Sequence, residues 1–262
     1  MPKEQSYKKI HFTRIIKGEK EKEKISDIIV QESFLSVILN KEKVITLKCS
    51  PEDYDYLGIG FLYTSGILQK KEDINSIVVD EEQKMIKIKA KNIYSHLESS
   101  WRDGLIPRRS NRIDEKLISK LLLVKHFLKV ESGIIFSLMH DMQKRAKLFK
   151  LTGGVHSCAL VNKQGSIILF SEDISRYNTI DKILGGAFVN DITTEDKIIL
   201  TSCRITSGIL RKIIIGKLPI VISRAAPTDL AIKLAKKMGI TLVGFVRGKR
   251  MNIYTHPERI EV

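Results

Sequence analysis

The sequence predicts an α/β protein in which a smaller N-terminal α+β domain precedes a larger C-terminal domain with a parallel sheet. Three short, continuously apolar runs lie at 197–201, 218–223 and 240–246, and helical patterns separate them. Continuous apolar runs are typical of strands buried on both faces, and the strand–helix–strand order predicts parallel pairing with right-handed crossovers. The N-terminal third instead shows short alternating runs of the hairpin type around one helical pattern.

A stretch without periodicity divides the chain. Residues 95–112 collect Gly, Pro, Ser and Arg, which is typical of a long loop or a domain junction. The first two dozen residues combine KGEKEKEK with little apolar content, which predicts a mobile arm. For the 262 residues we therefore expect an arm at 1–24, an N-terminal domain with its terminal loop at 25–113, and a C-terminal domain at 114–262.

The N-terminal domain is expected to contain two strand pairs and one helix. The runs DIIVQ, FLSVILN and KVITLK predict strands with a turn near Asn40. A helix is expected to follow Ser50 and Pro51, because Ser50 can cap it and Pro51 fits the first turn. DINSIVVD and KMIKIKAK predict a further pair, whose turn runs from Asp80 to Gln83.

Helical patterns fill most of the C-terminal domain outside the strands. They follow Asp114, Ser132 and Arg176 and recur between the three apolar runs, and Pro227 and Gly239 are expected to open and close the last of them. Their expected core residues are Leu117, Leu121, Val124 and Leu128; Ile135, Leu138, Met139 and Met142; Ile180, Ile183, Leu184 and Phe188; Ile209, Leu210, Ile213 and Ile214; and Leu230, Ala231, Leu234 and Ala235.

The ends of the three parallel strands predict an anion site. Ligands of open parallel sheets bind outside the carboxyl ends of the strands. Here the strands run into Thr201-Ser202-Cys203-Arg204, Ser223-Arg224 and Arg247-Gly248-Lys249-Arg250. Arginine, hydroxyl groups and helix N-termini all favour phosphate, so these turns are expected to form a phosphate cradle. The alternative is that they are ordinary polar loops.

Two further segments are expected to face the same crevice. LTGGVHSCAL places Thr152, Gly153, Gly154 and His156 just before a strand, where glycine allows close approach of a backbone to a ligand. His156 is equally well explained as a core histidine. The segment 171–188 is expected to bring four polar residues to a helix start: Asp173, Arg176, Asn178 and Asp181.

Composition limits the partners. With 45 Lys+Arg against 30 Asp+Glu the net charge is +15, which favours a polyanionic partner or reflects a lysine-rich solvated surface. Nucleic-acid binding is disfavoured because aromatic content is only 6% and no recognisable module is present. We expect a cytoplasmic protein without a membrane span, because no apolar run is long enough for a span or a secretory signal. Three scattered cysteines form no disulfide framework.

Several catalytic chemistries lack their motifs. There is no CxxC for a zinc deaminase, and the histidine segment reads His156-Ser157-Cys158; there is also no phosphate-binding Walker loop, no GxGxxG that opens a helix and no GxSxG elbow. Cysteine chemistry stays open, because Cys203 lies beside Arg204 at a strand-to-helix turn and Cys158 shares a segment with His156. Each cysteine is also explained as a small buried apolar residue.

Four motifs in order resemble the formate dehydrogenase accessory proteins, the FdhD sulfur carriers. They are LTGGVHSCAL, SEDISRYNTIDKILGGA, TSCRITSGILRKI and SRAAPTDLAIKLAKKMGITLVGFVRGKRMNIYT. The N-terminal half resembles the family more loosely, through VQESFLSVILN and CSPEDYDYLGIGFLYTSGIL. The resemblance spans about Asp27 to Thr255.

The resemblance implies a C-terminal three-layer domain similar to cytidine deaminases but without zinc. It also implies a role in formate dehydrogenase maturation, in which sulfur from a cysteine desulfurase is passed to the bis(guanine dinucleotide) form of the molybdenum cofactor. That cofactor is then the bound cargo, cysteine desulfurase and formate dehydrogenase are the partners, and a homodimer is left open. By resemblance, the cargo is held by Phe245, Val246, Arg247, Gly248, Lys249 and Arg250.

One departure from the family concerns sulfur transfer. Family members carry sulfur on a CxxC loop between the two halves, whereas SSWRDGLIPRRSNRID occupies that place here and no cysteine lies between Cys49 and Cys158. Either Cys158 or Cys203 takes over the persulfide role, or the protein binds the cofactor or docks on its client without carrying sulfur. No catalytic residue is therefore assigned.

Overall fold

The structure is a computed structural model, and it describes residues 4–18, 21–93 and 128–262. Part of the prediction falls outside these residues: the loop at 95–112 and the helix with Leu117, Leu121 and Val124. Among the described residues no helix is long and apolar enough to cross a membrane.

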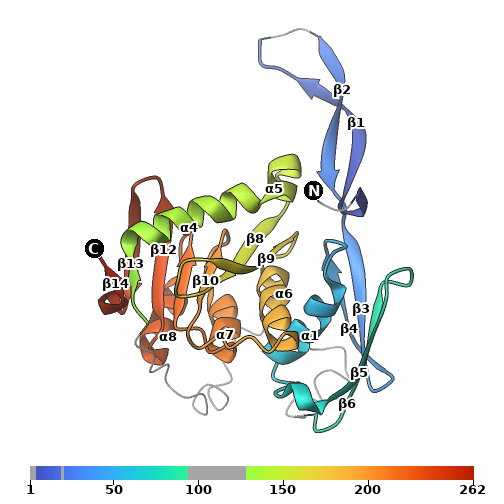
Figure 1. The fold of residues 1–262 in the computed structure, drawn as a ribbon. Helices are drawn as coiled ribbons and strands as arrows, with labels where there is room; N and C mark the ends of the chain where they lie inside the picture. Colours follow the sequence, from blue (N-terminus) through green and yellow to red (C-terminus); the bar gives the residue numbers. More distant parts are fainter. Residues whose placement is uncertain (1–3, 19–20, 94–127) are drawn as a thin grey trace.

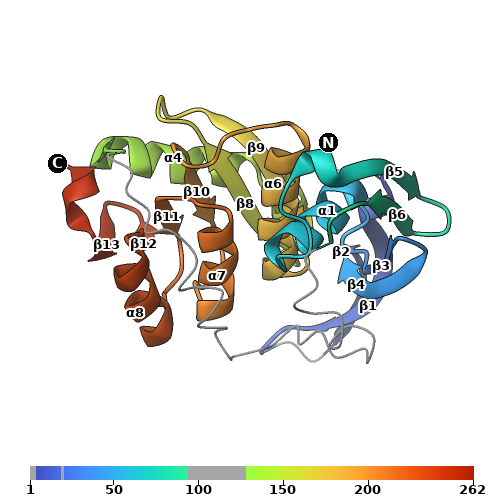
Figure 2. The ribbon, with the colours of Figure 1, turned by 90° about the horizontal axis from the view of Figure 1, so that it is seen from below.

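A six-stranded mixed sheet forms the centre of the C-terminal domain (Figures 1 and 2). Its strand order is β13-β12-β11-β10-β8-β9. The three strands that the apolar runs predict are parallel, and antiparallel strands flank them on both sides. The bounds are β8 (His156–Val161), β9 (Ile167–Asp173), β10 (Ile198–Thr201), β11 (Ile220–Ser223), β12 (Thr241–Arg247) and β13 (Arg250–Thr255).

Helices cover both faces of this sheet and complete three layers. One face packs against α6 (Arg176–Val189), α7 (Ser207–Ile215) and α8 (Asp229–Met238). The other face packs against α4 (Ser132–Arg145), which α5 (Lys147–Thr152) follows. Alternate strand residues such as Leu160 and Val161 enter opposite cores, as expected for strands buried on both faces. The predicted three-layer arrangement is therefore observed, whereas its likeness to deaminases stays an expectation.

The N-terminal domain is a four-stranded sheet packed on one helix. Its order is β4-β3-β6-β5, in which β3 and β6 are parallel. The elements are β3 (Ser33–Leu39), β4 (Glu42–Cys49), α1 (Tyr54–Thr64), β5 (Ile74–Asp80) and β6 (Met85–Ala90). Short pieces complete the chain: η1 (Glu4–Ser6), η2 (Lys71–Asp73), β7 (Val130–Glu131), η3 (Pro257–Arg259) and β14 (Ile260–Glu261), of which β7 and β14 pair.

Two glycines allow helix α1 of the N-terminal domain to pack closely against helix α6 of the C-terminal domain. A Cβ built on Gly60 of α1 would lie 1.8 Å from the backbone oxygen of Asp181, and one built on Gly185 of α6 would lie 2.0 Å from that of Tyr56. The two helix backbones therefore cross closer than any side chain would permit. Figures 1 and 2 both show α1 and α6 side by side at the junction.

Three expectations differ from the structure. The segment 1–24 contains strand β1 (Tyr7–Ile15) and the start of β2 (Lys22–Val30), an antiparallel hairpin, so ordered structure begins before residue 25. Helix α1 begins at Tyr54, and Ser50 contacts the Asp173 loop instead of capping it. Leu230 is 51% exposed, because α8 turns its first residues towards solvent.

Candidate functional site

The strand register gathers the predicted turns at one edge of the C-terminal sheet. Thr201 at the end of β10 pairs with Ser223 at the end of β11. Because β8 runs antiparallel to β10, its first residue, His156, lies at the same edge, opposite Asp173 at the end of β9. We call this row the strand-end edge: His156, Arg176, Ser202, Arg204, Arg224 and Arg247.

The turn after β10 is fixed by hydrogen bonds to β8. The backbone N–H of Ser202 donates to the Ser157 carbonyl oxygen (3.0 Å), and the Ser157 N–H donates to the Ser202 hydroxyl oxygen (2.9 Å). Ser202 thus orients the turn, and among the described residues its hydroxyl group has no acceptor for its proton. Arg204, two residues on, has an exposed side chain.

The turn after β11 is joined to the last residues of β12 by hydrogen bonds. The Arg247 Nε donates to the Arg224 carbonyl oxygen (2.8 Å), and the Phe245 N–H donates to that of Ala225 (3.2 Å). Phe245 has φ of 53°, a left-handed conformation that costs energy for an aromatic residue and is typical of functional turns. The Arg247 guanidinium lies 5.5 Å from the centre of the Phe245 ring, within cation–π range.

The rest of the predicted segment 245–250 divides between core and surface. Val246 is buried in the core beneath α4, where it supports the turn and offers no ligand contact. Gly248, with φ of 56°, makes the tight turn between β12 and β13. Lys249 and Arg250 are exposed beside it and add positive charge.

His156 is half-buried between arginines. Burial lowers its pKa, and the nearby charges of Arg176 and Arg204 lower it further, against an opposing effect of Asp173. The imidazole is therefore neutral near pH 7 and can donate a hydrogen bond without adding charge.

Positive charge at the edge is not neutralised within the described part of the chain. No ion pair with a described carboxylate is formed by Arg176, Arg204, Arg224 or Arg247. Guanidinium groups arranged in this way favour phosphate, which they bind through paired hydrogen bonds.

A buried ion pair holds the end of β9 and helix α6 together next to the strand-end edge. Asp173 accepts hydrogen bonds from the backbone N–H groups of Ser50 (3.1 Å) and Ser175 (2.9 Å), and it pairs with Lys182 at 2.9 Å, with both side chains fully buried. Burial lowers the pKa of Lys182, but the charges of Asp173 and Asp53 and the hydrogen bond to Asp173 together outweigh it, so the pKa is raised and the ammonium group stays protonated.

The sequence did not disclose Lys182 as part of this support. It lies among Ile180, Ile183 and Leu184 on a helix that reads as apolar, and a lysine inside such a run was the only available signal. Two polar residues that were predicted to face the ligand have structural contacts in the interior instead. Asn178 Nδ2 donates to Asp173 (2.9 Å), and Asp181 pairs with Lys212 (2.7 Å) between α6 and α7.

The residues 152–154 have local roles. The Thr152 hydroxyl donates to the Leu148 carbonyl oxygen (2.8 Å) and accepts from the Gly154 N–H (3.2 Å). Gly153 ends α5 in the left-handed region with φ of 65°. A Cβ on Gly154 would lie 2.6 Å from Val30 Cγ1, so the missing side chain makes room for strand β2 and not for a ligand.

All three cysteines are buried. Cys49 and Cys158 have no exposed surface, and Cys203 is 1% exposed although it lies at the strand-end edge. Burial raises the pKa of both the Cys158 and the Cys203 thiols, and the hydrogen bond to Thr201 only partly offsets this at Cys203. The protonated, covered thiols are therefore poor nucleophiles.

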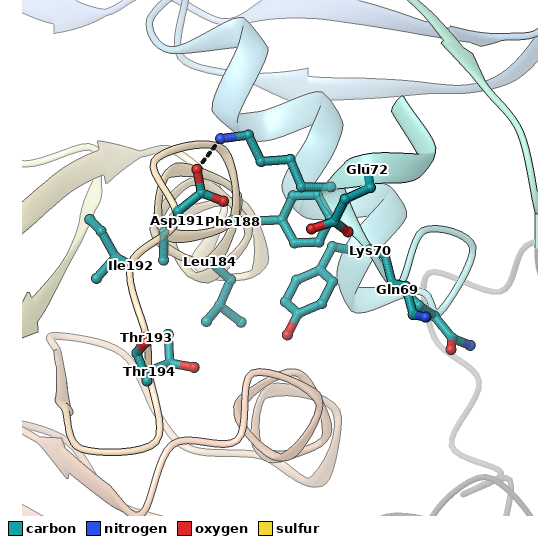
Figure 3. A pocket seen from close by; sticks show the side chains of 12 residues that line it. Gln69, Lys70, Glu72, Leu184, Phe188, Asp191, Ile192, Thr193 and Thr194 are labelled. Atoms are coloured by element: carbon teal, nitrogen blue, oxygen red, sulfur yellow. Dashed lines mark hydrogen bonds and ion pairs between the residues drawn. The ribbon is translucent and has the colours of Figure 1, made fainter. Parts of the chain in front are cut away.

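A cavity of about 340 Å³ lies at the opposite end of α6 (Figure 3). Phe188, Leu184 and Tyr63 form its apolar part, and Lys71 and Asp191 make an ion pair at its rim. It contains none of the predicted site residues. Within the described ranges, no cluster of three or more His, Cys, Asp and Glu side chains could hold a metal ion.

Comparison with known proteins defines the class. The fold matches the crystal structure of a proposed formate dehydrogenase accessory protein from Desulfotalea psychrophila, with a TM-score of 0.79 and 26% identity, over 96% of this chain and 99% of that one. The fold thus places the chain with α/β proteins of the formate dehydrogenase accessory class. The model of the FdhD/NarQ family matches residues 30–261, and the chain belongs to this family.

Three curated relatives of this chain have the same name. "Sulfur carrier protein FdhD" of Shouchella clausii is 34% identical over 91% of this chain and 92% of its own length. The proteins of the same name from Bacillus subtilis and Saccharolobus solfataricus are 34% and 32% identical, and each match covers 90% of this chain and 92% of the relative. The resemblance found in the sequence motifs is therefore confirmed.

Proposed function

We propose that this protein matures formate dehydrogenase by holding the bis(guanine dinucleotide) form of the molybdenum cofactor at the strand-end edge before the enzyme receives it. The observation that carries the proposal is the cluster of exposed arginines at the ends of three parallel strands. The family and the names of its relatives support the client, formate dehydrogenase.

The residues of the edge fit such a cargo. Each guanine dinucleotide arm contains a pyrophosphate, and Arg204, Arg224 and Arg247 offer planar guanidinium donors that match phosphate oxygens. The Phe245 ring beside Arg247 is half-exposed and gives a flat surface against which a base or pterin ring can stack. His156 adds a neutral hydrogen-bond donor between Arg176 and Arg204.

The second candidate function is sulfur transfer, with a cysteine desulfurase as donor and the same cofactor as acceptor. The names of the relatives favour it, and so does the position of Cys203 next to Arg204 at the edge. The buried, protonated thiols argue against it, because a persulfide carrier must expose its sulfur to two partners in turn. Cofactor binding requires no such opening and is the better supported function.

A binding measurement with matched charge variants tests the proposal. GDP serves as the probe for the guanine dinucleotide arm, and its affinity is measured by calorimetry. We expect R204A/R247A to weaken binding at least about tenfold, which corresponds to the loss of two charge-assisted phosphate contacts. K236A/K237A removes the same charge from exposed positions at the far end of α8 and should bind GDP as the unchanged protein does. If both variants lose GDP affinity equally, binding depends on the net charge alone and the proposed site is wrong.

Two further measurements test whether the protein holds the cofactor in cells and whether it accepts sulfur. After co-expression with formate dehydrogenase, the purified protein should contain pterin and guanine nucleotide. After incubation with a cysteine desulfurase and cysteine, mass spectrometry should show no adduct of about 32 Da, the mass of one sulfur on a thiol. Such an adduct, lost in the Cys203→Ser variant, would favour the second candidate instead. The homodimer stays a prediction, which the mass in solution would test.

A further inference from the structure

The hairpin β1–β2 extends away from both domains. Figure 1 shows it projecting beyond the rest of the chain at the end that carries α5. Within strands β1 and β2 no residue is buried, and Ile15 and Ile29 are 72% and 41% exposed. A two-stranded hairpin alone is marginally stable in water, so nine paired residues with exposed isoleucines favour a surface that a partner covers.

The base of the hairpin is fixed next to the strand-end edge. The Gln31 N–H donates to the Ser6 carbonyl oxygen (2.9 Å) and closes the base, while the Ser6 hydroxyl donates to Glu52. Val30 fills the space left by Gly154, two residues before His156. The hairpin therefore stands beside the edge where the cargo is proposed to bind, and a protein that takes the cargo must approach past it.

Charge indicates the chemistry of the partner. Strand β1 carries Lys8, Lys9 and Arg14 and no acidic residue, while β2 carries Lys22 and Lys24 against Glu23 and Asp27. On one face of the hairpin, Glu23 and Asp27 balance the charges of Lys8 and Arg14. The other face carries Lys9, Lys22 and Lys24 together with Ile15 and Ile28, and no acidic residue. The complement of this basic face is an acidic, partly apolar surface.

We propose that the hairpin β1–β2 is the docking arm for the client, and that it binds an acidic, partly apolar surface of apo-formate dehydrogenase next to the cargo site. The inference rests on the proposed function, because the client is taken from it. It adds the contact surface, which no part of the cargo site provides. A second copy of this chain fits less well, because each copy has a net charge of +15.

A shortened hairpin tests the arm without disturbing its base. Residues 11–26 are replaced by Asn-Gly, since Ile10 and Asp27 are directly paired and a two-residue turn of this sequence closes such a pair. The contacts of Ser6, Gln31 and Val30 are kept. A second variant, K9E/K24E, retains the full hairpin and reverses two exposed lysines of its basic face. The matched control, K87E/K89E, reverses two exposed lysines on β6, which lies in the other N-terminal sheet.

Two binding measurements separate the arm from the cargo site. Affinity for apo-formate dehydrogenase, purified from cells that lack the molybdenum cofactor, should fall at least about tenfold in the shortened variant and in K9E/K24E, and should not change in K87E/K89E. Affinity for GDP should stay within about twofold in all of them. If the unchanged protein fails to bind GDP, the proposed function is wrong. If GDP binds but the shortened variant still binds the client normally, the docking arm is wrong.

Other partners for the arm are outcomes of the same experiment. Light scattering after gel filtration gives the mass of each variant, and a dimer that becomes a monomer on shortening would assign the hairpin to a second copy and overturn the proposal. Retention of a DNA or RNA duplex by the unchanged protein that the shortened variant loses, with client binding unaffected, would overturn it as well.

Discussion

Replacement of Gly60 by alanine should destabilise the protein through the crossing of α1 and α6. The added Cβ would lie 1.8 Å from the Asp181 carbonyl oxygen and 3.0 Å from the Gly185 nitrogen, whereas ordinary contact begins at 3.4 Å. These are backbone atoms, so no rotamer change relieves the overlap and the helices must separate. Overpacking of this kind costs about 3 kcal/mol or more, and the better helix propensity of alanine returns only about 1 kcal/mol.

Thermal unfolding followed by circular dichroism measures the effect. For a chain of this size each kcal/mol lowers Tm by roughly 2–4 °C, so Gly60→Ala should unfold about 4–8 °C below the unchanged protein. The Cβ of Gly186→Ala would lie 3.1 and 3.3 Å from the Tyr56 ring and 3.4 Å from Leu169 Cδ1, and the substitution should cost less because these are side chains that can move. Gly133→Ala in α4 meets nothing within 4 Å and should be neutral or slightly stabilising. Unchanged Tm for Gly60→Ala would refute the close crossing.

Three further predictions concern the site. Asp173→Ala should cost about 3–5 kcal/mol in unfolding by denaturant, because it leaves the Lys182 ammonium buried without its counter-charge; Lys182→Met should cost less, because three N–H donors still satisfy Asp173. A thiol-specific disulfide reagent should modify fewer than about one cysteine per native chain, because all three are buried. In denaturant it should modify all three. GDP affinity should rise as pH falls below about 6.5, and His156→Gln should remove that increase.

The sign of the pH prediction follows from the surroundings of His156. Burial and two guanidinium groups hold its pKa below the ordinary value of 6.5 in the free protein. A bound phosphate opposes the guanidinium charges and raises that pKa, so binding takes up a proton between the two values. Affinity then increases as the pH falls through this window. GDP itself gains a proton in the same pH range. The test is therefore the difference in the pH dependence of GDP affinity between the unchanged protein and His156→Gln.

Patterns within a few residues predicted the C-terminal sheet well. The apolar runs gave β10, β11 and β12 and their parallel order, because burial on both faces leaves a signal in each strand by itself. Gly239 ends α8 in the left-handed region, as its position predicted. The same topology then placed Arg204, Arg224 and Arg247 at one edge, since the carboxyl ends of parallel strands coincide.

Features that depend on distant residues were not predictable in this way. The KGEKEKEK segment reads as a solvated arm, and only the pairing of Tyr7 with Val30 and onwards makes it a hairpin. Ser50 has the chemistry of a helix cap, but Asp173 lies 123 residues away in sequence and claims its backbone N–H. Gly154 was interpreted as a ligand contact, whereas the space it leaves is filled by Val30. In each case a long-range contact overrides a sound local preference.

Helix α6 explains why the N-terminal domain matters to a site on the C-terminal sheet. Its first residue, Arg176, lies at the strand-end edge, and its buried residues are held by the other domain. Thr64 of α1 donates to Asp181 (2.6 Å), and Asn178 donates to the Lys48 carbonyl oxygen (2.7 Å). The position of Arg176 is therefore set by contacts that cross the domain junction. A variant that loosens the junction should move a guanidinium group at the edge, so Gly60→Ala should weaken GDP binding even at temperatures where the protein remains folded.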